Sequence, residues 1–393
     1  MKILIITDVA PPLLGGGEVY VTQLGIQLVS LGHEIHWLTC KLPNTKEYEV
    51  YHGIHIHRIP ILFTNRFYFP GRQTFPIMLS LKKLDFVQQM DIVQSNTFVA
   101  GYSGWRVARK YKKPSLLFCH EFFGALWSRI GQNFLERKIY PIIERRIAKS
   151  PYDWYACPSE YSKSTMINVG TPENRISVIP HGINHELFNP DADARCFRKK
   201  FGLENLLLFG YVGRLRIKST TQSKNLIMLL KMTKIVTEQI PDARLVLAGA
   251  GYLEEMESVV HNMGLDKYVI YIGNIPYEQN PKFLRMCDVI ICPAVADGFC
   301  FLLAEASASG CPVIATNAGS HKERVIHGKT GYLVPVTVDE IARTMVQTIR
   351  DIDKTHSLGL EGHASTKELT WEKSAKKHVQ LYEMLISGNV PEK

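Results

Sequence analysis

Short apolar runs rich in β-branched residues alternate with longer amphipathic patterns along most of this chain. Between the first two runs, Glu18–Leu31 has apolar residues spaced three and four apart and is followed by Gly32, which predicts a helix that ends at a glycine. Strands and helices that alternate at this length favour parallel sheets covered by helices on both faces, so the pattern predicts an α/β fold. The predicted strands are Ile3–Thr7, Ile35–Thr39, Ile54–Arg58, Ile92–Ser95 and Ser115–Cys119, followed by Leu207–Val212, Arg244–Ala248, Val269–Ile272, Val289–Cys292, Pro312–Ala315 and Gly331–Val334.

The predicted strands fall into two series, which indicates two similar α/β halves in tandem. A chain of 393 residues suits two domains of about 150–200 residues each. Proline and glycine punctuate the connection from Val178 to Pro190, and the amphipathic stretch Trp371–Ile386 predicts a terminal helix that packs back across the domains. We therefore expect one domain from residues 1–185 and 372–393 and a second from residues 186–371.

Composition narrows the class of protein. The sequence has no run of about 18 apolar residues, and Asp8 and two prolines soon interrupt the apolar start, so neither a transmembrane helix nor a signal peptide is expected. The eight cysteines are scattered without a CxxC pair. This favours reduced thiols in a cytoplasmic protein over a disulfide framework or a zinc site.

Positive charge is concentrated in one part of the chain. The formal net charge is +9, and residues 51–150 hold 16 lysine and arginine residues against 5 acidic ones. This surplus suits an anionic partner, such as phospholipid headgroups, a phosphate-bearing substrate or nucleic acid, and it is equally compatible with a basic solvated surface. No recognised nucleic-acid-binding module accompanies the charge, so nucleic acid is not an expected partner.

Two motifs of the first half lie where strands are predicted to end. The glycines Gly15 and Gly16 stand between the first strand and the first helix, where they form either a phosphate cradle at the helix N-terminus or only a tight turn. His120 directly follows a predicted strand. Ligands of parallel sheets gather at the carboxyl ends of strands, so His120 is a candidate for substrate contact or proton transfer, with a structural role as the alternative.

Two motifs of the second half carry charge. Arg214 follows the strand Leu207–Val212, at a place where a guanidinium can bind a diphosphate, and Lys218 and Lys224 come next. Asp297 and Glu305 follow the strand Val289–Cys292. Asp297 either binds a ligand or caps the next helix, whereas Glu305 lies in an apolar run and needs a partner if it is buried.

These motifs occur in the order in which they occur in the retaining glycosyltransferases of family 4, and the sequence resembles that family over roughly residues 3–335. The resemblance is carried by blocks at Gly15–Glu18, Gly32–Glu34, His120–Glu121, Pro158–Ser162, Ile179–Asn184, Gly213–Leu215, Gly249–Gly251, Asp297–Glu305, Gly310–Ala315 and Gly319–Glu323. It implies the GT-B fold, in which two Rossmann-like parallel-sheet domains face a central cleft. It also implies transfer of a hexose from a UDP- or GDP-sugar to a hydroxyl acceptor, with retention, and without a divalent metal or other cofactor.

The resemblance further implies roles for individual residues. Arg214 and one lysine would bind the donor diphosphate, Glu305 the ribose, Asp297 the donor sugar, and His120 would sit by the acceptor. The remaining implied donor-binding residues are Gly15, Gly16, Gly298, Phe299, Cys300, Phe301 and Leu302. Asp297 replaces the family's glutamate, and Cys300 replaces a small residue. Spacing favours Lys218 as the diphosphate lysine, but the helix after Asn225 favours Lys224, which we choose.

The acceptor is expected on the basic first half. Aromatic and basic residues there suit an anionic lipid surface at the inner face of the cell membrane, or else form an ordinary helix with a buried aromatic side. The residues named for this surface are Arg66, Arg72, Lys82, Lys83 and Trp127. Two rival functions remain open at this stage, a nucleotide-sugar 2-epimerase and a catalytically silent protein of the same fold that binds sugar nucleotides or acts as a scaffold.

Overall fold

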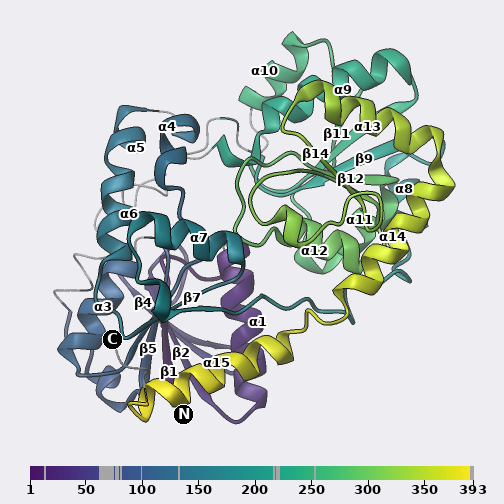
Figure 1. The fold of residues 1–393 in the computed structure, drawn as a ribbon. Helices are drawn as coiled ribbons and strands as arrows, with labels where there is room; N and C mark the ends of the chain where they lie inside the picture. The colour runs from purple at the N-terminus through teal and green to yellow at the C-terminus, as the bar shows by residue number, and fades with distance from the viewer. Residues whose placement is uncertain are drawn as a thin grey trace. The chain divides into compact units, whose positions relative to one another are not determined.

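In the computed structural model of this protein, internal contacts divide the chain into two units (Figure 1). Unit 1 comprises Met1–Ala125, Lys138–Gly182 and Trp371–Lys393, and unit 2 comprises Leu126–Arg137 and Ile183–Thr370. These boundaries lie within a few residues of the predicted ones, except that Leu126–Arg137 groups with unit 2, which the sequence did not predict. The structure describes residues 1–12, 15–61, 75, 79, 82–98, 100–131, 133–215, 217, 222–251 and 254–389.

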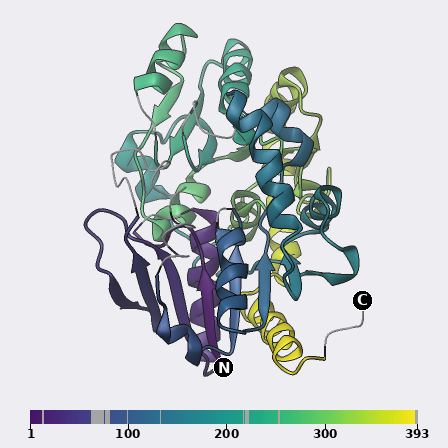
Figure 2. The ribbon, with the colours of Figure 1, turned by 90° about the vertical axis from the view of Figure 1, so that its left-hand side faces the viewer.

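Unit 1 is built on a sheet whose strands lie side by side in Figure 2. In the described part of the chain the strand order is β3-β4-β2-β1-β5-β6-β7-β8, with β3 antiparallel to β4 and every other neighbouring pair parallel. The central strands are continuous apolar runs because helices cover both faces of the sheet. The strands are β1 (Lys2–Ile6), β2 (Glu34–Cys40), β3 (Tyr48–Tyr51), β4 (Ile54–Ile59), β5 (Ile92–Asn96), β6 (Ser115–Phe118), β7 (Trp154–Cys157) and β8 (Ile176–Val178).

Helices connect these strands, and the C-terminal helix α15 returns to pack beside α1 in unit 1 (Figure 1). The Tyr20 hydroxyl on α1 hydrogen-bonds Nε2 of His378 on α15 at 2.8 Å in a buried position. The helices are α1 (Gly16–Ser30), α3 (Ala100–Lys110), α6 (Tyr140–Ala148), α7 (Glu160–Val169) and α15 (Trp371–Ile386), with 3-10 turns η1 (Asp85–Gln89), η2 (Gly124–Leu126) and η3 (Glu173–Arg175). Two short helices, α4 (Trp127–Ile130) and α5 (Phe134–Lys138), lie in or next to the segment that groups with unit 2.

Unit 2 is built on an all-parallel sheet with the order β11-β10-β9-β12-β13-β14 among its described residues. Its strands are β9 (Leu207–Val212), β10 (Ala243–Ala248), β11 (Val269–Tyr271), β12 (Val289–Cys292), β13 (Val313–Thr316) and β14 (Tyr332–Val334). Its helices are α8 (Arg195–Phe201), α9 (Leu226–Gln239), α10 (Glu254–Asn262), α11 (Asn280–Met286), α12 (Phe301–Ala308), α13 (Val338–Arg350) and α14 (Ile352–Thr366), with η4 (Gln222–Lys224), η5 (Tyr277–Gln279) and η6 (His321–Glu323).

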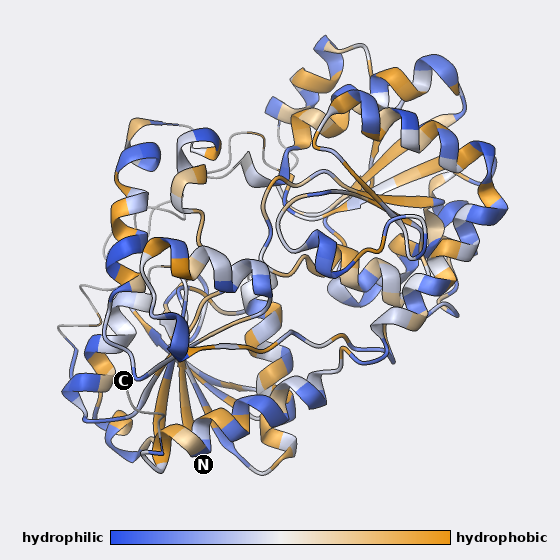
Figure 3. Ribbon diagram, viewed as in Figure 1, coloured by the Kyte–Doolittle hydropathy of each residue, from blue (hydrophilic) through white to orange (hydrophobic). Residues whose placement is uncertain are grey.

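The core of unit 2 consists of two apolar clusters, one on each face of the sheet. Leu208 and Ile290 belong to one cluster, and their chain neighbours Phe209 and Val289 belong to the other. Successive side chains of a strand point to opposite faces, so this division shows that both faces are covered. In Figure 3 the strands are accordingly mostly orange, while blue gathers on the helices.

The predicted α/β class with two Rossmann-like parallel-sheet units is confirmed. Strands β9 and β12 and helix α15 match their predicted bounds at both ends, and the other predicted strands differ by one or two residues. Strands β3, β7 and β8 were not predicted. None of the helices described is both long and apolar enough to cross a bilayer.

Candidate functional site

The order of strands locates a candidate site in each unit. In unit 2 the chain goes from β9 outward to β10 and β11, then returns to β12 on the other side of β9. In unit 1 the order reverses in the same way between β1 and β5. Open α/β sheets bind ligands at the carboxyl ends of the two strands where the order reverses. The loops after β9 and β12, and those after β1 and β5, are therefore the first places to look.

In unit 2, the structure brings Lys224 and Asp297 together at this point. Lys224 ends η4 and its Nζ donates to Asp297 Oδ2, while Asp297 Oδ1 accepts from the backbone N–H of Cys300 at 2.7 Å and of Phe299 at 3.3 Å. Burial by itself raises the pKa of Asp297, but the Lys224 ammonium, together with His321 and the hydrogen bonds, holds it below its usual value. Asp297 is therefore an anion that caps the turn before α12 and also neutralises Lys224.

Backbone contacts fix the loop that carries Asp297. The Val295 N–H donates to the Ser223 carbonyl at 2.8 Å, which ties this loop to the one that precedes α9, and the Ser320 N–H donates to the Asp297 carbonyl at 3.0 Å. Gly319 has a left-handed φ of 57°, and a Cβ there would lie 2.6 Å from the Asp297 backbone nitrogen. Only glycine fits this close approach, so the loop after β13 is built to support the loop after β12.

Glu305 lies on α12 and is 5% exposed. Its Oε1 accepts a hydrogen bond from the Tyr277 hydroxyl at 2.7 Å. Burial raises the pKa of Glu305 to about 8, and the hydrogen bond from Tyr277 lowers it only in part. The sequence predicted that a carboxyl group in this apolar run needs a partner. The partner is Tyr277, which the sequence did not identify.

Arg214 follows β9 and has an exposed side chain with no carboxylate partner among the residues described. The turn before it is tightly packed, because a Cβ on Gly249 would lie 2.0 Å from the Gly213 carbonyl oxygen. The backbone there holds Arg214 at the strand end while its side chain stays available to an anion. The competing lysine, Lys218, lies outside the described residues.

The other predicted donor-binding residues of unit 2 form the turn into α12. Gly298, Phe299 and Cys300 are buried, and α12 begins at Phe301, with Leu302 in its first turn. The N–H groups of Phe299 and Cys300 are already used by Asp297. The groups of this segment that can attract an anion are therefore the backbone N–H groups in the first turn of α12, at its N-terminal end.

In unit 1, the glycine loop and His120 lie close together. Helix α1 begins at Gly16 with Gly15 as its N-cap, and a Cβ on Gly17 would lie 3.8 Å from His120 Nε2. Burial lowers the pKa of His120 to about 4, so its imidazole is neutral near pH 7. Its Nε2 lies 3.5 Å from Asn96 Nδ2, and Asn96 is the last residue of β5. The imidazole of this site is thus neutral, and two carboxyl groups border the same loops. Asp8 Oδ1 accepts from the Ala100 N–H at 2.8 Å, and Glu18 Oε2 would lie 2.9 Å from a Cβ on Gly15.

The predicted acceptor surface is changed by the structure. Lys82 and Lys83 are exposed, and Lys83 pairs with Asp85 at 3.3 Å. Trp127 is only 3% exposed. Since a membrane-facing tryptophan has to be accessible, the assignment of Trp127 to that surface is wrong. Arg66 and Arg72 lie outside the described residues.

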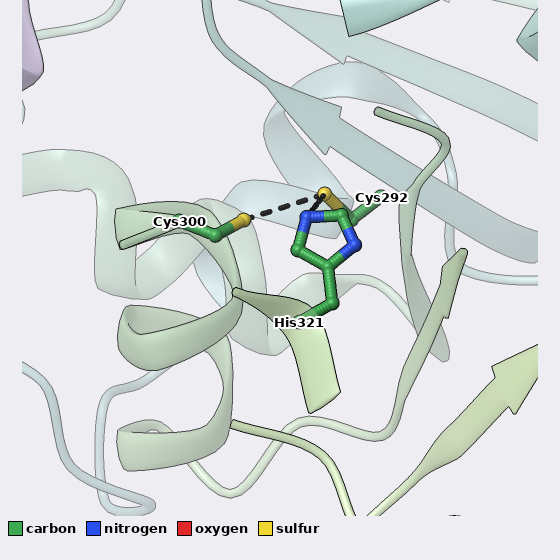
Figure 4. A group of neighbouring side chains, drawn as sticks. All are labelled: Cys292, Cys300 and His321. Atoms are coloured by element: carbon green, nitrogen blue, oxygen red, sulfur yellow. Dashed lines mark hydrogen bonds between the residues drawn. The ribbon is translucent and has the colours of Figure 1, made fainter. Parts of the chain in front are cut away.

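The structure also gathers residues that the sequence left apart. Cys292 at the end of β12, Cys300 before α12 and His321 in η6 are buried, and one ligand atom from each lies within 4.8 Å of the others (Figure 4). A search for CxxC pairs misses this cluster because its members come from three elements. The scatter of the cysteines argued against a zinc site, whereas the structure brings two of its eight free thiols to an imidazole.

Comparison with known proteins gives two family matches, one for each part of the chain. The family model described as Glycosyltransferase Family 4 matches residues 14–187, and the model described as Glycosyl transferases group 1 matches residues 194–363. A GDP-mannose-dependent alpha-(1-6)-phosphatidylinositol monomannoside mannosyltransferase from Mycolicibacterium smegmatis is 29% identical over 214 residues. The alignment covers 52% of this chain, and the chain spans a little over half the length of that relative, at 55%.

Solved structures show the same fold. Sucrose-phosphate synthase from Thermosynechococcus elongatus has a TM-score of 0.83 at 22% identity, and the match covers 98% of this chain and 99% of that one. HepE from Anabaena, in complex with UDP and glucose, has a TM-score of 0.79 at 19% identity with the same coverage. At these identities the likeness concerns the fold.

Proposed function

The chain belongs to glycosyltransferase family 4, and from this premise we propose that it transfers a hexose from a UDP- or GDP-sugar to a hydroxyl acceptor with retention of configuration. The observation that carries the proposal is the group of charges at the strand-order reversal of unit 2. Arg214, Lys224 and the end of α12 together offer two cations and a helix N-terminus where β9 and β12 end. This arrangement suits a nucleoside diphosphate more than any neutral ligand.

The leaving group is the charge that such a site has to stabilise. When the bond between sugar and diphosphate breaks, negative charge develops on the diphosphate, and fixed cations and N–H groups stabilise it more than they stabilise the bound donor. In the free protein Lys224 is neutralised by Asp297. The diphosphate would share Lys224 with Asp297 and engage Arg214, so transfer proceeds in this proposal without a divalent metal.

Glu305 and Tyr277 would recognise the nucleoside part of the donor. A ribose has two neighbouring hydroxyls, and a buried carboxyl group already held by Tyr277 can accept hydrogen bonds from them. Since ribose hydroxyls stabilise the ionised carboxyl group, donor binding would lower the pKa of Glu305 from its value of about 8. Donor binding near pH 7 is then expected to release a proton.

His120 would serve the acceptor side. A neutral imidazole beside the glycine loop can accept a hydrogen bond from a sugar or acceptor hydroxyl. For the acceptor we propose a lipid-linked or membrane glycan, reached from the cytoplasmic side of the membrane. The support is the basic surplus of residues 51–150 together with exposed Ile142, Arg145 and Arg146 on α6. Sedimentation with anionic liposomes tests this part, and unchanged partition of an Arg145→Glu/Arg146→Glu variant would contradict it.

A thermal-shift screen of nucleotide sugars tests the donor assignment. A ligand that binds only the folded protein raises its unfolding temperature. At equal concentration, UDP-sugars and GDP-sugars should therefore raise the unfolding temperature by different amounts. The corresponding nucleoside diphosphate, without the sugar, should give most of the same rise in unfolding temperature, because the charges of the site contact the diphosphate. No shift with any nucleotide sugar would refute the proposal.

Arg214→Ala tests the role of the charges. Its expected result is a loss of donor affinity and of transfer of about 10²-fold or more, because the cation is aimed at the diphosphate. The matched control is Arg343→Ala, which removes an exposed arginine of the same unit that pairs with Glu340. Equal transfer by the two variants would contradict the site. Incubation with the donor alone identifies a nucleotide-sugar 2-epimerase, because that enzyme makes a new sugar nucleotide without an acceptor. Incubation with donor and a panel of acceptors identifies a catalytically silent protein, because it forms no product with any of them.

A further inference from the structure

The cluster of Cys292, Cys300 and His321 in unit 2 has the donor atoms of a soft-metal site. The two Sγ atoms are 3.4 Å apart, and Cys292 Sγ is 3.6 Å from His321 Nε2. The Cys300 Sγ lies within 4.8 Å of a His321 ring nitrogen. Figure 4 shows the three side chains converging from β12, the turn before α12 and the segment after β13.

The Sγ–Sγ and Sγ–Nε2 separations fit a tetrahedral ion. Zinc lies about 2.3 Å from thiolate sulfur and about 2.0–2.1 Å from imidazole nitrogen, so ligand atoms at the observed distances would subtend angles of roughly 95° and 110° at the metal. Three protein ligands leave a fourth position for water. A planar three-coordinate ion would need the sulfurs to be farther apart, about 4 Å, which favours Zn²⁺ over Cu⁺.

The imidazole is already oriented for coordination. His321 Nδ1 lies 2.8 Å from the Thr316 carbonyl oxygen, which can only accept, so Nδ1 carries a proton and Nε2 is the nitrogen that faces the Cys292 sulfur. Metal-bound histidines generally use their second nitrogen in this way, which fixes both the tautomer and the ring plane. The outer contact therefore exists before any metal binds.

Charge balance also favours a divalent ion. Two thiolates and one Zn²⁺ sum to zero, so the filled site would place no net charge among buried residues. Without a metal, two thiols and an imidazole pack against one another in the interior of unit 2. Burying these polar groups costs more free energy than burying apolar side chains in their place. A bound structural ion would give all three polar groups a ligand.

We propose that Cys292, Cys300 and His321 form a zinc-binding site that fastens the loop carrying Asp297 to the segment after β13. The ion would connect both ends of that loop, from Cys292 to Cys300, with η6. It would lie next to the proposed donor site but outside the transfer step, so the proposal does not depend on the identity of the donor.

Metal content of the reduced full-length protein tests the site directly. After removal of metal with a chelator and addition of one equivalent of Zn²⁺, followed by gel filtration, we expect one ion per chain by atomic spectrometry. Co²⁺ in place of Zn²⁺ should give a thiolate-to-metal charge-transfer band and intense visible bands, which report tetrahedral coordination with sulfur. Zinc should also raise the unfolding temperature reversibly.

Variants assign the ligands. Removal of a residue that hydrogen-bonds a metal ligand typically lowers metal affinity about 10–100-fold. Removal of a ligand itself, in His321→Gln or Cys300→Ser, should lower zinc affinity at least as much and abolish the cobalt bands. Cys311→Ser is the control, because Cys311 is equally buried in unit 2 but stands outside the cluster. Absence of stoichiometric binding in the wild-type protein overturns the proposal even if a variant does not fold. Equal binding by Cys300→Ser and Cys311→Ser overturns it as well.

Discussion

The candidate sites of the two units lie at corresponding places in their sheets but differ in chemistry. In unit 2, the strand-order reversal gathers charged groups, with Arg214 exposed and Lys224 paired to Asp297. In unit 1, it places His120, which burial holds neutral, beside the glycine loop, together with the carboxyl groups of Asp8 and Glu18. The sheets determine where a ligand binds, and the loops determine what kind of ligand it is.

The support behind each site follows the same division. Behind His120 in unit 1, a buried network links Tyr20, His378, Gln94 and Tyr382 through hydrogen bonds of 2.6–3.1 Å without a full charge. Behind Lys224 in unit 2, support comes from a carboxylate and from backbone N–H groups. A neutral network suits a site for sugar hydroxyls, and a charged one suits a diphosphate. Salt and pH should therefore affect the two sites differently.

Lys224→Met is expected to have the largest effect. It removes a cation from the proposed leaving-group site and leaves Asp297 without its ion-pair partner, so kcat/KM should fall about 10²–10³-fold. Binding of the nucleoside diphosphate should weaken far more than binding of the nucleoside alone. Both are measured by calorimetry and initial rates.

The control for this change is Lys231→Met, because Lys231 is an exposed lysine of α9. It removes the same charge from the same unit at another place and should leave kcat/KM unchanged. If Lys224→Met lowers nucleoside and diphosphate binding equally, Lys224 serves the fold rather than the diphosphate, and the charged character assigned to this site is incorrect.

Glu305→Gln is expected to have the next largest effect, on stability. In the unfolded chain Glu305 ionises near 4.5, whereas in the folded protein it keeps its proton to about pH 8. Between these values the unfolded state binds fewer protons, so stability falls as pH rises through this window. The amide cannot ionise, and at pH 7 the variant should be more stable by on the order of 2–3 kcal/mol.

Denaturant unfolding between pH 4 and pH 9 measures this difference. The gain should vanish near pH 4, where the wild-type carboxyl group is protonated in both states. Glu278→Gln is the control, since it makes the same change at an exposed carboxyl group next to Tyr277. A gain that is constant over the whole range would mean that Glu305 is ionised in the folded protein.

The sequence predicted most of the central strands because they are buried on both faces, although the equally buried β7 was missed. Strands β9 and β12 are continuous apolar runs between turn residues, and their predicted bounds are those of the structure. Strand β3 alternates exposed and half-buried residues at an edge, and β8 has only three residues, so neither gives a strong signal. The carboxyl ends of the well-predicted strands were also the places where the site residues were proposed.

The partners of those residues were beyond the reach of the sequence. Tyr277 stands 28 residues before Glu305, and no periodicity relates the 3-10 turn η5 to α12, because α11 and β12 lie between them. His321 meets Cys292 because β12 and β13 are neighbours in the sheet, which only the topology reveals. Residue type and local pattern indicated which groups carry charge, whereas pairing, burial and the resulting pKa values came from the structure.

Tyr20→Phe is expected to have the smallest effect and tests the neutral side of the comparison. The Tyr20 hydroxyl contacts His378 Nε2 at 2.8 Å and accepts from Gln94 Nε2 at 3.1 Å, so its removal should lower the free energy of unfolding by about 1–2 kcal/mol. Because these groups are uncharged, the loss should be the same at low and high salt, and donor affinity in unit 2 should not change. Tyr155→Phe, which removes a buried hydroxyl that donates to the Ser150 carbonyl at 2.6 Å, is the control in the same unit. A loss in Tyr20→Phe that depends on salt, with none in the control, would show that a charged group takes part in the Tyr20 network and would contradict its neutral character.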